Sequence, residues 1–192
     1  MTGRTIEELA VGDTAELTRS VTAETIREFV EVTGDDNPLH SDPAFAATTR
    51  FGDVIAPGIL TGGLISAVIG TRLPGPGTIY LSQAFRFLRP VRIGDAITAR
   101  VEVTEVLREK NRLALRTTCA NQAGETVIEG EALVMPSRVH IDYAAPEPAR
   151  GWGGAACTPA ALAVQAMSFW ATSGLTFAAK MLELWEARPV RS

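Results

Sequence analysis

The sequence contains only two cysteines, Cys119 and Cys157, and only two histidines, His40 and His140. Neither pair has the close spacing, such as CxxC, that brings metal ligands together. Two isolated cysteines also do not make a disulfide framework. We therefore predict a protein with no disulfide and no bound metal.

Long apolar runs and blocks of basic residues are absent too. No stretch reaches the roughly 18 apolar residues that a membrane helix needs, and residues 1–8 are polar and charged, unlike a secretory signal. The formal net charge of −4 gives the chain no general attraction to a phosphate backbone. We expect a cytoplasmic protein that does not bind nucleic acid.

What is present is the composition of a globular protein, with 46% hydrophobic and 21% charged residues among 192. This is enough for one complete core. Residues 14–21 alternate as on a half-buried strand, and Thr22 is suited to cap a helix that ends at Gly34. Residues 58–71 form an uncharged, mostly apolar run, which is typical of a helix buried on nearly all sides.

Four segments from residue 78 onward have the β-branched or alternating character of strands. They are residues 78–88, 95–107, 112–120 and 125–134, separated by turn-forming stretches. Consecutive strands with short turns form an antiparallel sheet, and the uncharged helix is what such a sheet would wrap. The sequence predicts an α+β protein with the hotdog fold, a curved antiparallel sheet around a long buried central helix.

The last part of the chain has a different character from this domain, which we place at residues 1–136. Residues 137–159 are rich in Ala, Pro and Gly and indicate a linker. Residues 160–192 carry an apolar stripe at helical spacing, which predicts a C-terminal amphipathic helix. This helix could pack on its own chain or a partner subunit, adhere to a hydrophobic granule, or close over a substrate channel.

Asp35 and His40 are the strongest candidates for chemistry. Gly34 ends the preceding helix and Asn37-Pro38 enforces a turn, so the two side chains can converge on one small volume. A carboxylate and an imidazole with a pKa near about 6.5 can together hold a water molecule and remove its proton. The same run is also good turn chemistry in a protein without activity, and both interpretations stay open on these residues alone.

Residues 29–46 as a whole resemble the hydratase motif of the MaoC-like (R)-specific enoyl-CoA hydratases, and the similarity extends over roughly residues 8–136. One departure is Pro57, where some relatives have a His. The matching positions are Phe29, Val32, Thr33, Gly34, Asp35, Asn37, Pro38, Leu39, His40 and Ala46.

The resemblance implies a catalytic pair at Asp35 and His40, with Asn37 shaping the turn and helping to position the water. It also implies an oxyanion donor at the backbone N–H of Gly58. A helix N-terminus has unpaired N–H groups and a partial positive charge, which suits that role. Ser66 corresponds to a supporting position, although a small residue there could equally serve helix packing.

The implied partners are an acyl-CoA substrate and a second copy of the chain. In hotdog enzymes CoA runs along the dimer interface, so Arg86 and Arg89 could contact its phosphates or could simply face solvent. We expect a homodimer also because a single hotdog leaves a sheet edge that usually pairs with a second copy.

The implied activity is a lyase reaction, the reversible hydration of a trans-2-enoyl-CoA to an (R)-3-hydroxyacyl-CoA. No cofactor is expected, because CoA is part of the substrate. Some relatives of this kind supply polyhydroxyalkanoate synthesis. Three alternatives remain: a 3-hydroxyacyl dehydratase acting on acyl-carrier-protein substrates, a hotdog acyl-CoA thioesterase, and a non-catalytic acyl-CoA binding module.

Overall fold

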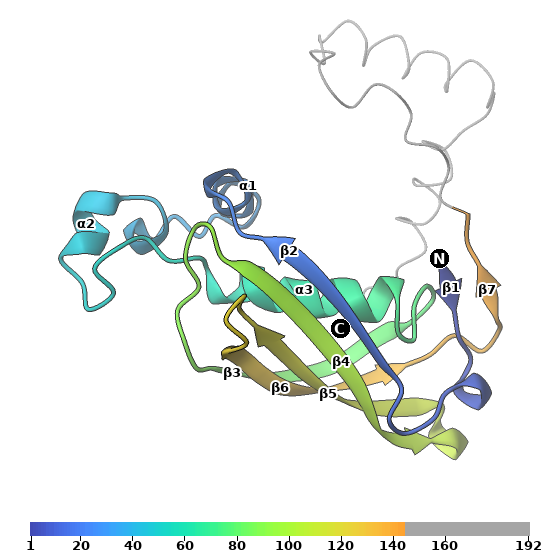
Figure 1. The fold of residues 1–192 in the computed structure, drawn as a ribbon. Coiled ribbons are helices and arrows are strands. Elements are labelled where there is room, and N and C mark those ends of the chain that lie inside the picture. The colour runs from blue at the N-terminus through green and yellow to red at the C-terminus, as the bar shows by residue number, and fades with distance from the viewer. Residues whose placement is uncertain (145–192) are drawn as a thin grey trace, which may run out of the picture. The chain divides into compact units, whose positions relative to one another are not determined.

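The computed structural model describes residues 1–144, and its main feature is a five-stranded antiparallel sheet in the order β2-β4-β5-β6-β3 (Figure 1). Each strand confirms one expected from the sequence, with bounds that differ by at most one residue at either end. The strands are β2 (Thr14–Ser20), β3 (Ile79–Phe87), β4 (Ala96–Leu107), β5 (Arg112–Ala120) and β6 (Thr126–Met135).

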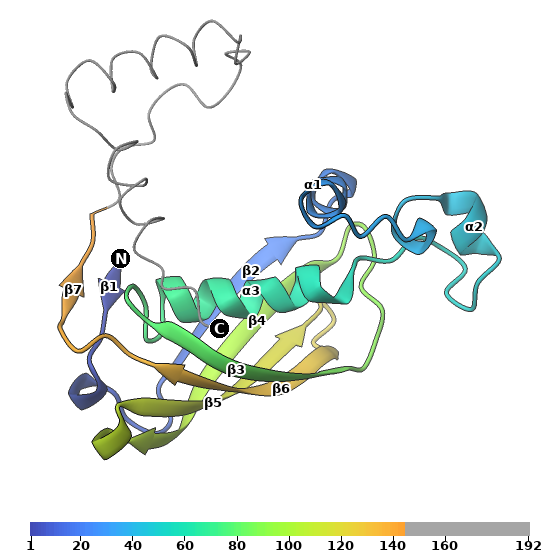
Figure 2. The same cartoon turned by 180° about the vertical axis from the view of Figure 1, so that it is seen from behind.

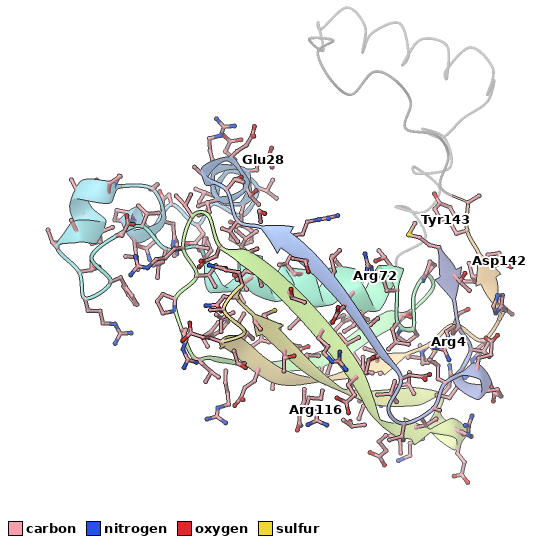
Figure 3. All side chains as sticks on the ribbon, in the orientation of Figure 1. Arg4, Glu28, Arg72, Arg116, Asp142 and Tyr143 are labelled. Carbon is pink, nitrogen blue, oxygen red and sulfur yellow. The ribbon has the colours of Figure 1, made fainter. Side chains whose placement is uncertain are left out.

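One face of the sheet is apolar and buried, and the other is polar and exposed. In β5, Leu113, Leu115 and Cys119 are fully buried. Arg116 lies between them in sequence but points away from the core (Figure 3), and its guanidinium pairs with Glu102 of β4 at 3.1 Å. This alternation, with a period of two residues, is the pattern that made the strands recognisable in the sequence.

The helix α3 (Gly58–Thr71) lies across the apolar face of the sheet (Figure 2) and has the bounds expected from the sequence. Ile65, Val68 and Ile69 on this helix are fully buried. The expectation of burial on nearly all sides is wrong for the single chain, because the sheet curls around only one side of the helix. Besides the end residues Gly58 and Thr71, the exposed positions follow one helical face and are Ile59, Gly63, Ser66 and Gly70. No helix of residues 1–144 combines the length and hydropathy needed to span a membrane.

The two edges of the sheet are formed by β2 and β3. β3 pairs with β6 and not with β4, although β4 follows it in the sequence, and β2 pairs with β4 at the opposite edge. The β3 edge exposes the large apolar side chains of Ile79, Leu81 and Phe87. An exposed edge with apolar side chains is a surface that proteins normally cover or pair.

The helix α1 (Ala23–Thr33) delivers the chain from β2 to the candidate site, and both of its ends were expected. The side chain of Thr22 accepts a hydrogen bond from the Thr25 N–H at 3.1 Å. Gly34 has a φ of 74°, a left-handed conformation that glycine adopts without strain, and its N–H donates to the Val30 carbonyl at 2.8 Å. The Gly34 cap fixes where the chain leaves the helix, one residue before Asp35.

A separate two-stranded sheet joins β1 (Thr2–Gly3) to β7 (Ile141–Asp142). Hydrogen bonds between Met1 and Tyr143 extend this pairing. β7 lies beyond the domain boundary expected at residue 136, because a two-residue strand is too short to leave a periodic pattern. Most of the linker expected at residues 137–159, and all of the helix expected at residues 160–192, lie outside the described residues.

Candidate active site

A short turn after α1 positions His40 at the candidate site. Asn37 caps a short 3₁₀ turn, η2 (Pro38–His40): its Oδ1 accepts a hydrogen bond from the Leu39 N–H at 3.1 Å. The His40 N–H donates to the Asn37 carbonyl at 2.9 Å. Pro38 occupies the first position of the turn, where no N–H is needed. Asn37 therefore shapes the turn that presents His40.

His40 is half-buried and held by one hydrogen bond. Its Nδ1 lies 2.7 Å from the carbonyl oxygen of Ile55. Because a carbonyl oxygen can only accept a hydrogen bond, Nδ1 carries the hydrogen and Nε2 of the neutral ring keeps its lone pair. The ring is thus fixed in the tautomer that can take a proton through Nε2.

Asp35 differs from His40 in being exposed to solvent. Its backbone N–H donates to the Thr33 hydroxyl at 3.3 Å. Within residues 1–144 its carboxylate makes no hydrogen bond or ion pair, and it does not line the pocket described next. Asp35 and His40 are close in sequence across the turn, but within the described part of the chain no hydrogen bond or ion pair joins their side chains.

A pocket of about 410 Å³ contains His40, Gly58 and Arg89 among the residues expected at the site. Its other walls are largely apolar and come from the segment before α3, from the end of β3, and from β6. These apolar residues include Ile55, Ala56, Ile59, Phe87, Val91 and Ile128. Such a lining suits an acyl chain better than a polar metabolite.

Gly58 opens α3 and lies at the wall of this pocket. The residue before it, Pro57, provides no side-chain cap. The first N–H groups of a helix have no partner within the helix, and the helix dipole adds partial positive charge there. The start of α3 is therefore able to hold a negatively charged oxygen inside the pocket.

Gly58 also allows a close contact that the sequence did not indicate. A Cβ atom at this position would lie 2.7 Å from Cε1 of Phe87, and one at Gly62 would lie 2.9 Å from Cε2 of Phe85. The centroids of the Phe85 and Phe87 rings are 6.0 Å apart, with an angle of 55° between the ring planes. Each ring packs against one of the two glycines. The space beside the Gly58 Cα is filled by an aromatic ring, so glycine at 58 serves helix-to-strand packing as well as any approach by a ligand.

Thr61 is a pocket residue that we did not predict. Its side chain is 1% exposed, and within residues 1–144 its hydroxyl oxygen is the buried side-chain oxygen without a hydrogen-bond partner. The thiol of Cys119 lies 3.7 Å from the Thr61 carbonyl oxygen. Burial raises the pKa of that thiol to about 12, so Cys119 stays protonated and is no nucleophile at neutral pH.

Two other predicted residues lie away from this pocket. Ser66 lines a separate depression with Tyr80 and Gln83 on the exposed face of α3. Arg86 points to another part of the surface, where its guanidinium pairs with Glu129 at 2.9 Å. The structure thus brings together His40, Gly58 and Arg89, and leaves Ser66 and Arg86 outside this group in the single chain.

Comparisons with known proteins agree with this arrangement. Residues 9–123 match the family described as MaoC like domain. The chain is 48% identical over 137 residues to the 3-hydroxybutyryl-CoA dehydratase of Methylorubrum extorquens, covering 71% of this chain and 87% of the relative. It is 48% identical over 133 residues to the (R)-specific enoyl-CoA hydratase of Rhodospirillum rubrum, covering 69% and 92%. Among solved structures, the unliganded R-hydratase PhaJ1 of Pseudomonas aeruginosa is similar with a TM-score of 0.69 at 46% identity, covering 77% of this chain and 96% of that one.

Proposed function

Because this chain belongs to the MaoC-like family, we propose that it adds water reversibly to a trans-2-enoyl-CoA and forms the (R)-3-hydroxyacyl-CoA. The two relatives described above are named for hydration and for dehydration, the two directions of such a reaction. One structural observation carries the proposal. A single apolar pocket contains a histidine with a free basic nitrogen and an uncapped helix N-terminus.

In the proposed mechanism, His40 Nε2 takes a proton from water as the water oxygen attacks C3 of the enoyl group. The electrons of the C2–C3 double bond move toward the thioester, and the Gly58 N–H stabilises the charge on its oxygen. His40 then returns the proton to C2, which restores the carbonyl and completes the addition of one water. Asp35 orients the water, with Asn37 holding the turn between them. No cofactor takes part, since CoA is a portion of the substrate.

Reaction with crotonyl-CoA tests this proposal against the alternatives. We expect the enoyl absorbance to fall without release of free thiol, and chiral analysis to give the (R)-3-hydroxy product. Release of thiol would instead identify a thioesterase. If crotonyl-CoA is unchanged but crotonyl-acyl-carrier-protein reacts, the protein is a dehydratase of carrier-bound substrates. If neither reacts while crotonyl-CoA binds, it is a binding module.

The oxyanion role of Gly58 can be tested with two substitutions at that position. Gly58→Pro removes the N–H and should lower kcat by at least about 10²-fold, because one such donor contributes roughly 3 kcal/mol. Proline is tolerated in a first helical turn, so the helix should persist. Gly58→Ala is the matched control: it keeps the N–H, although its Cβ displaces the half-exposed Phe87 ring. Equal losses in both variants would show that packing against Phe87, and not the donor, accounts for the effect.

A homodimer is supported by two surfaces that one chain leaves exposed, the β3 edge and the outer face of α3. Both present apolar side chains, such as Leu81 and Ile59. Light scattering coupled to size exclusion measures the assembly directly. Contact of the expected C-terminal helix with a partner subunit or a granule stays a prediction, as does the cytoplasmic location.

A further inference from the structure

Arginine side chains contribute to the rim of the pocket that holds His40 and Gly58. Arg50 lies in the loop that precedes α3, and Arg89 follows β3. Both residues are exposed, and both line the same pocket. The protein as a whole is acidic, with a formal net charge of −4. Two cations at the opening of one apolar pocket therefore stand out against the rest of the surface charge.

The two arginines differ in how far their charge is neutralised. Arg89 donates to the Thr126 carbonyl at 2.9 Å, and its Nε lies 3.6 Å from a carboxylate oxygen of Glu125. Arg50 has its guanidinium carbon 4.8 Å from the centre of the Phe51 ring, and no carboxylate of residues 1–144 pairs with it. A guanidinium resting on an aromatic face is oriented, yet all of its N–H donors remain available.

The segment that carries Arg50 is held in place by a neighbouring arginine. Arg92 donates from Nη2 to the Phe51 carbonyl at 2.8 Å, and its Nη1 lies 3.8 Å from Asp53. The Ala56 N–H also donates to the Val91 carbonyl at 2.8 Å. Arg92 is thus committed to bracing this segment, and Arg50 is the pocket arginine whose charge is left uncompensated.

We propose that Arg50, assisted by Arg89, binds a phosphate group on the pantetheine carrier of the substrate. This inference rests on the proposed function, since that function supplies a thioester whose reacting end is held near His40 and Gly58. Guanidinium groups bind phosphate oxygens through paired N–H donors. The carrier leaves the pocket toward solvent, which is where these exposed side chains lie.

A carboxylate on the acyl chain is the competing ligand for these cations, and the pocket argues against it. Its interior is formed by buried apolar residues such as Ala56, Val91 and Ile128. A charged acyl end in that environment would lose its water without gaining a partner. The cations are at the exposed rim, so they match the carrier and not the acyl end.

The test compares thioesters that share the crotonyl group and differ in the carrier. Crotonyl-CoA and crotonyl-4′-phosphopantetheine carry phosphate, and crotonyl-pantetheine does not. For Arg50→Ala we expect KM to rise about five-fold with crotonyl-CoA at low salt, the size of a partly exposed charge-assisted contact, with kcat unchanged. With crotonyl-pantetheine, KM should match that of the parent protein. Arg50→Lys should recover part of the loss, because it keeps the charge but not the paired donors.

Two matched variants control for general electrostatics. Arg19→Ala removes an exposed charge from β2, outside this pocket, and should leave KM for every thioester unchanged. Arg86→Ala removes the second arginine that the sequence had suggested as a CoA contact. Arg86 pairs with Glu129 outside the pocket. An equal KM increase in Arg86→Ala and Arg50→Ala would overturn the assignment to the pocket rim.

The remaining outcomes decide the proposal and identify the phosphate. If Arg50→Ala raises KM for both crotonyl-CoA and crotonyl-4′-phosphopantetheine, the bound group is the pantetheine phosphate. Acyl carrier protein carries the same phosphate, so KM for crotonyl-acyl-carrier-protein should then rise too. If KM rises for crotonyl-CoA alone, the bound group is one of the outer phosphates of CoA. An unchanged KM for all substrates, or an equal increase with crotonyl-pantetheine, overturns the inference. Hydration of crotonyl-pantetheine by the parent protein shows independently that the proposed function holds.

Discussion

The layer of α3 against β2, β4 and β5 differs sharply from the site segment, residues 35–57, which carries Asp35, Asn37 and His40. In the layer, side chains such as Val101, Val103 and Leu115 are fully buried and contact one another. The site segment is mostly exposed up to Asp53. Its order comes from local turns and caps, such as Asn37 before η2 and Asp42 before the short helix α2 (Pro43–Ala47). The core holds the fold together, whereas short-range hydrogen bonds position the chemistry, so changes in the two regions should affect different measurements.

The sharpest test of this contrast removes the candidate pair in the site segment. Asp35→Asn and His40→Ala should each lower kcat by at least about 10²-fold, because each deletes one member of the water-activating pair. Circular dichroism melting should give nearly the parent Tm, since neither side chain is part of the buried core. Near-normal turnover in either variant would contradict its assigned role.

A core substitution should produce the opposite pattern. Leu115→Ala removes a fully buried side chain from β5 and should lower the free energy of unfolding by about 3 kcal/mol, within the range for cavity-forming changes. Urea unfolding measures this directly. The kcat at a temperature where the variant is folded should be close to that of the parent. Val11→Ala is the exposed control and should change stability by less than about 0.5 kcal/mol.

Thr61 lies where the two regions meet, and a substitution there should increase the free energy of unfolding. Thr61→Val replaces a buried hydroxyl without a partner by a methyl group and should raise the free energy of unfolding by about 1 kcal/mol. Thr117→Val is the matched change at a buried threonine whose hydroxyl accepts from Gln83 Nε2 at 3.0 Å. It should lower stability by about 1 kcal/mol, because the Gln83 amide loses one of its two acceptors, the other being the Ala84 carbonyl. Destabilisation by both would mean that the Thr61 hydroxyl has a partner in solution.

The smallest effect is expected at His140, which lies outside both regions. The hydrogen bond to Glu8 at 2.8 Å raises the pKa of His140 above its ordinary value of 6.5, and the Thr5 N–H, followed by His140, lowers the pKa of Glu8 below 4.5. The histidine's contribution to stability is complete below about pH 6.5 and disappears as the pH rises through its raised pKa. The Glu8 contribution is present above about pH 4.5 and disappears as the pH falls through its lowered pKa. In melts across pH 5 to 9, His140→Gln should flatten the decline of Tm above neutrality; an identical decline in both proteins would exclude this contact.

Much of the architecture could be predicted because its signals are local. Thr22 and Gly34 mark the two ends of α1, and the absence of charge from residues 58–71 marks the central helix. The strand bounds follow from alternation over single segments. The pairing of β3 with β6 does not, because alternation shows which face of a strand is buried and says nothing about which strand lies beside it.

The candidate site shows the same division. Asn37 and His40 lie within one short motif, so their turn could be anticipated from the sequence. Arg50 and Thr61 join the pocket only through the three-dimensional path of the chain, and their spacing carries no signal of its own. Arg86 and Arg89 were indistinguishable in sequence, yet Arg86 is paired on the surface and Arg89 reaches the pocket from beyond the end of β3.

The pairing of β1 with β7 brings the two ends of the described domain to one place. This small sheet is tied to the far end of the central helix, because the Arg4 N–H donates to the carbonyl of Pro74, just after α3, at 2.9 Å. The pocket is at the other end, where Gly58 begins the helix, and 14 helical residues rise about 20 Å. Met1 is therefore an attachment point for an affinity tag, a solid support or a fused protein, about one helix length from the pocket.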